Sequence, residues 1–103
     1  MEIYSQQFWR KLNKYCKFFS YTLNGLCIDI FYKNEKIGNC KLIKVITPKG
    51  RSYKFNLDIK YKKIIINEIG FFQNICMLDF KEEIFYKTEI IMFKELYLKG
   101  FFK

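Results

Sequence analysis

A strictly alternating stretch at residues 53–62 constrains the fold of this chain more than any other feature. Its odd-numbered positions are aromatic or aliphatic, and its even-numbered positions are polar or charged. The two sets are Tyr53, Phe55, Leu57, Ile59 and Tyr61, and Lys54, Asn56, Asp58, Lys60 and Lys62. Because successive side chains of a β-strand point to opposite faces, the pattern predicts a strand with one buried face and one largely cationic face.

Four further segments are predicted to be short strands of the same sheet, each bounded by a change of pattern or by turn-forming residues. Turns are expected at residues 33–36 and 47–52, where Asn, Gly, Pro and Lys gather. The chain from 25 to 79 is therefore expected to be built of antiparallel strands. The four segments are residues 26–33, 40–47, 63–69 and 71–79, the last two on either side of Gly70.

A helix is predicted before the strands, over residues 3–19. Phe8, Leu12 and Phe19 recur there at helical spacing, and Asn24-Gly25 interrupts the pattern.

A second helix is predicted at residues 80–99, followed by a tail at 100–103. Asp79 stands where a capping residue is expected, and Gly100 stands where a helix would stop. Acidic residues near the start and lysines near the end suit the helix dipole. A period of two also fits residues 84–98, so a strand is the alternative there.

These elements predict a single α+β domain over residues 1–103. Its 50% of hydrophobic residues is enough for a core of its own. The expected architecture is an N-terminal helix, a small, strongly bent, five-stranded antiparallel sheet or barrel, and a C-terminal helix. Closure into a barrel is expected because an open sheet leaves unpaired edges.

From Gly25 onward the chain resembles the Sm-like family. The first motif of that family runs from a glycine through an alternating apolar strand to a Lys-Asn pair and a second glycine. The residues that match are Gly25, Ile28, Ile30, Lys33, Asn34 and Gly38, with Gly70 as the glycine of the second motif. The resemblance implies an N-terminal helix and a bent five-stranded barrel, and it covers residues 3–79.

The chain also departs from the Sm-like pattern. The spacing from Asn34 to Gly38 is shorter than usual, and Ile69 replaces the Arg that precedes the second glycine. Residues 47–52 lack the Asp and Asn that help Sm rings to hold a base. The resemblance therefore implies the fold without the uridine pocket. Gemin proteins, Sm-like scaffolds that assist ribonucleoprotein assembly, are the nearer comparison.

Positive charge is concentrated in the first two-thirds of the chain. Residues 1–63 hold 14 Lys or Arg against 4 Asp or Glu, whereas residues 64–103 hold 5 against 6. An AT-rich genome explains the many lysines, but such a bias acts evenly along a gene and leaves the asymmetry unexplained. The asymmetry predicts a basic surface for a polyanion such as RNA. The candidate phosphate-binding residues are Arg10, Lys14, Lys17, Lys41, Lys44, Lys49, Arg51, Lys54, Lys60, Lys62 and Lys63.

Each group of these cations also has a plainer interpretation. The stripe formed by Arg10, Lys14 and Lys17 is the ordinary solvated side of an amphipathic helix. Lys49 and Arg51 lie in a predicted turn, and turns are commonly basic for solubility alone. Tyr53 and Tyr61 are able to stack on bases if exposed, but their alternation with apolar residues favours core packing.

Aromatic residues exceed what a small core needs, which predicts a protein interface. The candidates are Trp9, Phe71, Phe72, Phe101 and Phe102. The Phe101-Phe102 pair is the best candidate for a docking peg, and packing back onto the domain is its alternative.

Catalytic, metal and cofactor motifs are missing from the sequence. It has no His and no Gly-rich phosphate loop, and no pattern places two carboxylates together for acid–base catalysis. Its cysteines, Cys16, Cys27, Cys40 and Cys76, form no C-x-x-C pair and are expected to be free, buried thiols. We therefore expect neither an enzyme nor a cofactor, metal or small-molecule substrate. The absence of a signal segment and of long apolar stretches predicts a cytoplasmic protein without a membrane partner.

Three functions remain open at this point. The first is a small non-catalytic protein that binds RNA or a ribonucleoprotein through phosphate contacts, as a ribosome-associated or assembly factor. The second is a small inhibitor of the phage anti-defence type, which blocks a protein partner. The third is a structural subunit that is stable only within a larger assembly.

Overall fold

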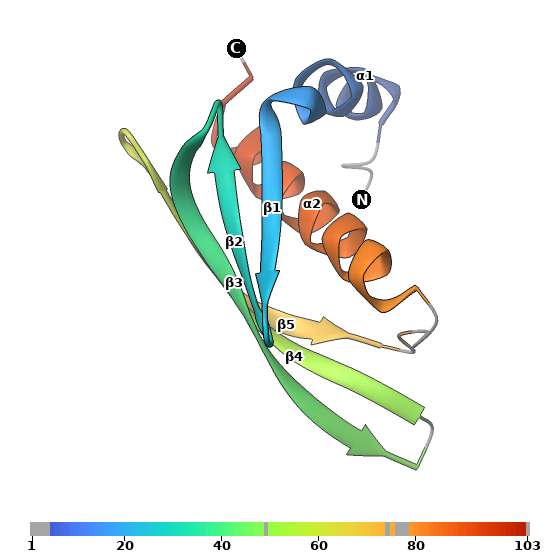
Figure 1. Ribbon diagram of the computed structural model, residues 1–103. Helices are drawn as coiled ribbons and strands as arrows, with labels where there is room; N and C mark the ends of the chain where they lie inside the picture. The colour runs from blue at the N-terminus through green and yellow to red at the C-terminus, as the bar shows by residue number, and fades with distance from the viewer. Residues whose placement is uncertain (1–4, 49, 74, 76–78, 103) are drawn as a thin grey trace.

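The protein is an α+β domain in which an open, five-stranded antiparallel sheet carries one long helix (Figure 1). The computed structural model describes residues 5–48, 50–73, 75 and 79–102. The strands follow one another in the order β1-β2-β3-β4-β5. The elements are α1 (Gln6–Tyr15), a 3-10 turn η1 (Cys16–Phe18), β1 (Phe19–Asn24), β2 (Cys27–Tyr32), β3 (Glu35–Thr47), β4 (Gly50–Tyr61), β5 (Ile64–Phe72) and α2 (Phe80–Leu98).

The first helix is shorter than expected, and an unpredicted strand follows it. Ser5 caps α1, because its hydroxyl oxygen accepts a hydrogen bond of 3.2 Å from the backbone N–H of Phe8. The helix gives way to η1 at Cys16, and Phe19 begins β1. Phe19 is buried as the helical pattern requires, but it reaches the core from a strand, with its ring 4.9 Å from that of Phe93.

Two-residue turns with left-handed residues join three pairs of strands. Gly25 (φ 64°) opens the turn between β1 and β2, and Lys33 and Asn34 (φ 50° and 70°) make the turn between β2 and β3. Lys62 (φ 54°) opens the turn between β4 and β5. Such conformations match the right-handed twist of hairpin strands. The expected turn at 33–36 is thus confirmed but shorter, and β3 already begins at Glu35.

Gly70 lies inside a strand rather than between two strands. β5 is continuous from Ile64 to Phe72, so the predicted division into 63–69 and 71–79 is wrong; residues 74 and 76–78 lie outside the described part. The ring of Phe55 packs over Gly70 at 2.8 Å from where a Cβ would lie, and it stacks on Phe72 at 4.4 Å. The glycine is therefore explained by close packing and not by a turn.

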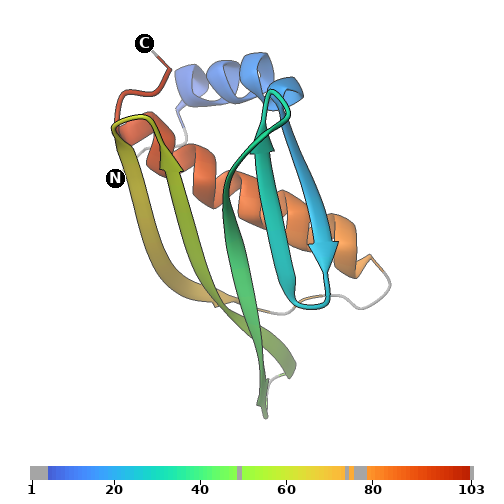
Figure 2. The same ribbon diagram turned by 60° about the vertical axis from the view of Figure 1, so that its left-hand side comes forward.

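The sheet does not close into a barrel, so this part of the expectation is wrong. β1 and β5 are its two edges, and α2 crosses one face diagonally (Figure 2). The buried face of β4 predicted from alternation is confirmed for Tyr53, Phe55, Leu57 and Ile59. Helix α2 meets this face with Ile84, Thr88, Met92, Phe93 and Leu96, all buried. The core therefore lies between the sheet and α2. A closed barrel would instead have enclosed its core within the sheet.

Helix α2 departs from expectation at its N-terminal end only. Asp79 occupies the N-cap position, but its side chain makes no capping hydrogen bond. At the other end Gly100 is left-handed (φ 76°), and the Phe101 N–H donates to the Leu96 carbonyl at 2.9 Å. This confirms Gly100 as the stop and turns the tail back toward the core.

Candidate nucleic-acid interface

The structure divides the predicted cations among three separate places. One group lies at the end of the sheet that carries α1 and the β2–β3 and β4–β5 turns (Figure 1). A second group lies on the sheet face opposite α2, and a third on the ribbon where β3 and β4 extend beyond the other strands. The groups are Arg10, Lys14, Lys17, Lys62 and Lys63; Lys41, Lys54 and Lys60; and Lys44 and Arg51, while Lys49 lies outside the described residues.

Three cations of the first group, Lys14, Lys17 and Lys62, lie beside a cluster of aromatic rings drawn from four parts of the chain. The Phe101 ring lies 5.4 Å from that of Tyr32 and 5.6 Å from that of Tyr61, between centroids. Phe18 joins the cluster through Tyr32 at 6.2 Å, and Tyr15 joins through Phe18 at 6.2 Å. The tail, α1 with η1, and the ends of β2 and β4 thus meet here.

Four lysine ammonium groups lie over these rings. The distances from Nζ to the ring centroid are 5.6 Å for Lys14 over Tyr15 and 5.2 Å for Lys17 over Phe18. Lys33 lies over both Phe18 and Tyr32, at 5.1 and 5.4 Å, and Lys62 lies over Tyr61 at 5.3 Å. All are within the range of a cation–π interaction. We call these four lysines and the rings of Tyr15, Phe18, Tyr32, Tyr61 and Phe101 the basic aromatic end.

The charges of the basic aromatic end are not neutralised within the described chain. No described carboxylate is ion-paired with its four lysines; the pair formed by Lys36 and Asp29, at 3.2 Å, lies on the sheet face instead. Lys14, Lys17, Lys33 and Lys62 are all exposed. Their combined field is therefore directed into solvent, where it attracts anions.

Helix α1 extends this basic surface. Gln7, Arg10, Lys11, Lys14 and Tyr15 line a shallow depression of about 260 Å³. The Lys11 ammonium donates a hydrogen bond of 2.6 Å to the Phe102 carbonyl and so ties the helix to the tail. Arg10 and Lys14, which line this depression, are both exposed and add positive charge to it.

The outer sheet face is less basic than its β4 pattern predicted. Lys41, Lys54 and Lys60 are exposed there, but cross-strand neighbours dilute their charge. Asp58 accepts a hydrogen bond from Asn67, and Phe71 lies opposite Lys54 in the strand register. One strand cannot reveal this, because the character of a sheet face depends on which residues lie beside it in neighbouring strands.

Most of the predicted interface aromatics are packed within the domain. Phe72 and Phe102 are buried, at 5% and 4% exposure, so little of either ring is left for a partner to contact. Phe101 is half-buried in the basic aromatic end, and Trp9 is half-buried with its ring 5.3 Å from that of Phe8. Only Phe71 of the five is largely exposed, at 57%.

Titratable groups in the interior are few among the described residues. The Tyr21 hydroxyl donates to Glu89 Oε2 at 2.8 Å. Burial raises the pKa of Glu89 above its usual range, partly offset by that hydrogen bond, and burial beside this carboxyl raises the pKa of Tyr21. Burial also raises the pKa of the Cys40 thiol to about 12.

Free thiols are confirmed for the three cysteines that the structure describes, but only one of the three is buried as expected. Cys40 is buried, Cys16 and Cys27 are half-buried, and Cys76 lies outside the described residues. In the described part no group of three or more His, Cys, Asp or Glu residues is placed to hold a metal ion.

Comparison with known proteins adds no family. No protein-family model, curated protein or solved structure matches the chain. Within the described residues, neither helix has both the length and the apolar character to cross a bilayer.

Lys33 is the one lysine of the basic aromatic end that sequence reasoning did not single out as a binding residue. In the sequence it was assigned to a strand end, to a turn and to the Sm-like motif, but not to a binding surface. The sequence does show Lys33 directly after Tyr32 at a strand end. It does not show that the ring of Phe18, far away in the sequence, lies beneath the same ammonium group.

Proposed function

We propose that this protein binds RNA, alone or within a ribonucleoprotein, through the basic aromatic end. The observation that carries the proposal is a set of four lysine ammonium groups held over one cluster of rings, none of them ion-paired with a carboxylate of the described residues. Packing against rings restricts these side chains, so less conformational entropy is lost when they meet a phosphate. Arg10 extends the contact surface along α1.

Phosphates, rather than bases, are the expected point of contact. Tyr32 is 8% exposed, and the other rings of the cluster are half-buried against one another. Lysine ammonium groups lie over all of these rings except that of Phe101, which leaves little room for a stacked base. Contacts to phosphates carry no sequence information, so binding with weak sequence preference is expected.

The strength of the salt effect follows from the number of contacts. For single strands, the logarithm of the binding constant falls with the logarithm of salt concentration by about 0.7 per phosphate contact. Four lysines each on one phosphate therefore give a slope of about −3.

The test compares two variants with equal changes of charge. In one, Lys17, Lys33 and Lys62 are changed to Gln, which removes three of the four cations of the basic aromatic end. The control changes Lys41, Lys54 and Lys81 to Gln. Lys81 is a suitable match because it also lies over a ring, 5.8 Å from the Phe85 centroid, but at the start of α2. Binding of a fluorescent single-stranded RNA is measured over a range of salt concentrations.

The two variants should separate clearly. The first should lose about 2 units of salt slope, while the control should keep the slope of the unchanged protein. Equal losses in both variants would show that net charge alone drives binding. A larger loss in the control would move the site to the outer sheet face. Either result, or binding that does not respond to salt, contradicts the proposal.

The inhibitor alternative has less support than RNA binding. Its best anchor was the Phe101-Phe102 pair, but Phe102 packs 5.3 Å from Phe93 and 4.8 Å from Tyr15, between centroids. The relation to the Sm-like family and the cytoplasmic location stay predictions.

A further inference from the structure

Strand β5 is an exposed edge of the sheet. In the part of the chain that the structure describes, it pairs with β4 on one side and with no strand on the other. It runs for nine residues from Ile64 to Phe72. One row of its backbone N–H and C=O groups is therefore available to another strand.

The side chains of β5 distinguish it from the opposite edge. Ile65, Ile69 and Phe71 point to the outer sheet face and are 63%, 56% and 57% exposed. At the other edge, the outward residues of β1 are Ser20, Thr22 and Asn24, all polar and exposed. Edge strands are normally protected by polar or charged side chains. β1 has that protection, and β5 does not.

Charge also sets β5 apart. The strand contains no Lys, Arg or Pro, and its one charged residue is Glu68, in a chain of net charge +9. Two copies of most of this surface would repel each other. At β5, two copies meet without opposing cations along the strand.

We propose that β5 pairs antiparallel with β5 of a second copy, so that a single sheet runs through a symmetric dimer. A two-fold axis at Asn67 places Ile65 of each copy opposite Ile69 of the other. Phe71 then lies opposite Lys63, which suits a cation–π contact. A shift of the axis to Glu68 would oppose two carboxylates, so the register centred on Asn67 is preferred.

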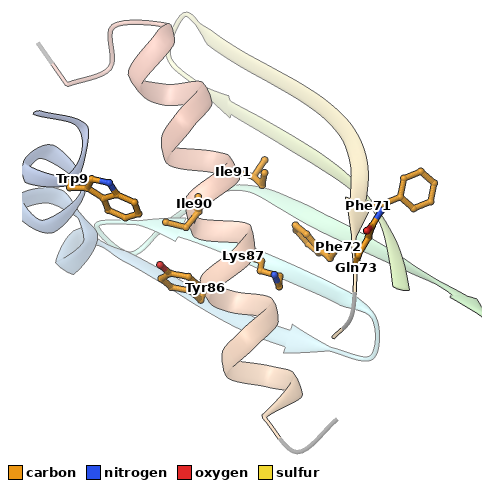
Figure 3. Close-up of a pocket in the computed structure, with 8 residues that line it drawn as sticks. All are labelled: Trp9, Phe71, Phe72, Gln73, Tyr86, Lys87, Ile90 and Ile91. Atoms are coloured by element: carbon orange, nitrogen blue, oxygen red, sulfur yellow. The ribbon is translucent and has the colours of Figure 1, made fainter. Parts of the chain in front are cut away.

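The inner side of β5 accommodates the same pairing. A groove of about 370 Å³ lies between this edge and α2 (Figure 3), lined by Phe72, Gln73, Lys87, Ile90 and Ile91, among others. In the Asn67-centred register, Ile64 of the second copy lies opposite Gly70, beside this groove. Its side chain would thus meet an apolar wall and not solvent.

The first test measures mass by sedimentation equilibrium without RNA, so its outcome is independent of the proposed function. The unchanged protein should show twice the 12.7 kDa of one chain. Ile69→Lys should show the mass of one chain, because it places a charge opposite the apolar Ile65 of the other copy. Thr22→Lys is the matched control at the β1 edge, and it should remain dimeric.

The register has its own test. In the Asn67→Cys protein, the new thiols of the two copies face each other across the two-fold axis. Mild oxidation should therefore join them in a disulfide and give a covalent dimer. Thr22→Cys should not cross-link. Three results would each overturn the proposed pairing. The first is an unchanged protein that is monomeric at all concentrations, and the second is a monomeric Thr22→Lys protein together with a dimeric Ile69→Lys protein. The third is an Asn67→Cys protein that does not cross-link.

Discussion

Replacing Gly38 with Ala should be among the most damaging single-methyl changes in this protein. Gly38 lies in β3 opposite Ile59 of β4. An added Cβ would overlap the backbone carbonyl oxygen of Asp58 and lie 2.9 Å from the Cα of Ile59. These are backbone atoms, which cannot rotate away as a flexible side chain would, so β3 and β4 must separate locally.

The cost can be assembled from two parts. Overpacking in a tight interior costs about 1–3 kcal/mol, and each backbone hydrogen bond lost from the ladder adds about 1 kcal/mol. The separation also disturbs Ile37 and Cys40, which are 4% and 0% exposed on either side of Gly38. With one ladder hydrogen bond lost, a decrease of about 2–4 kcal/mol in the free energy of unfolding is expected.

Gly25→Ala provides the matched control. Gly25 is left-handed (φ 64°), but a Cβ there meets no atom within 4 Å. Its cost is therefore conformational alone, about 1 kcal/mol. Urea unfolding followed by circular dichroism measures both changes. A Gly38→Ala protein as stable as Gly25→Ala would refute the close approach of β3 and β4 at this position.

The remaining predictions concern the buried titratable groups. Glu89 has a raised pKa when folded, so its carboxyl favours folding most at low pH, and this contribution is lost as pH rises through the raised pKa. Glu89→Gln should therefore gain stability relative to the unchanged protein between pH 4 and pH 7, measured by urea midpoints; a constant difference would contradict this. Burial of the Cys40 thiol, with its pKa raised to about 12, should prevent reaction with a disulfide reagent at pH 8 until the protein unfolds. Rapid labelling of Cys40 in the folded protein, identified by mass spectrometry, would show that this interior is open.

The fold was largely predictable where one local pattern decided it. The alternation in β4 needed no tertiary information, because it buries one face of a regular element. The helix of α2 was inferred from its end residues and charges, and a strand stayed open as the alternative because a period of two also fits residues 84–98. β1 was missed because Phe19 continues the helical spacing of Phe8 and Leu12 by coincidence. Barrel closure was wrongly expected because the sequence does not show that α2 lies across the sheet.

The binding surface was harder to predict than the fold. Lys14, Lys17 and Lys62 were identified as cations, but their grouping depends on hairpin turns and a tail that meet only in three dimensions. Lys33 was missed for that reason. The tail residue Phe101 was expected to bind a partner, yet it contacts the rings of Tyr32 and Tyr61, which lie under two of these lysines.

Lysine footprinting in the presence of RNA tests the central claim most directly. The protein is treated with an amine-acylating reagent, with and without single-stranded RNA, and modification at each lysine is measured by mass spectrometry. Protection should be strongest at Lys14, Lys17, Lys33 and Lys62, with Lys81 unchanged. Protection centred on the outer sheet face, or spread evenly over all lysines, would contradict a site at the basic aromatic end.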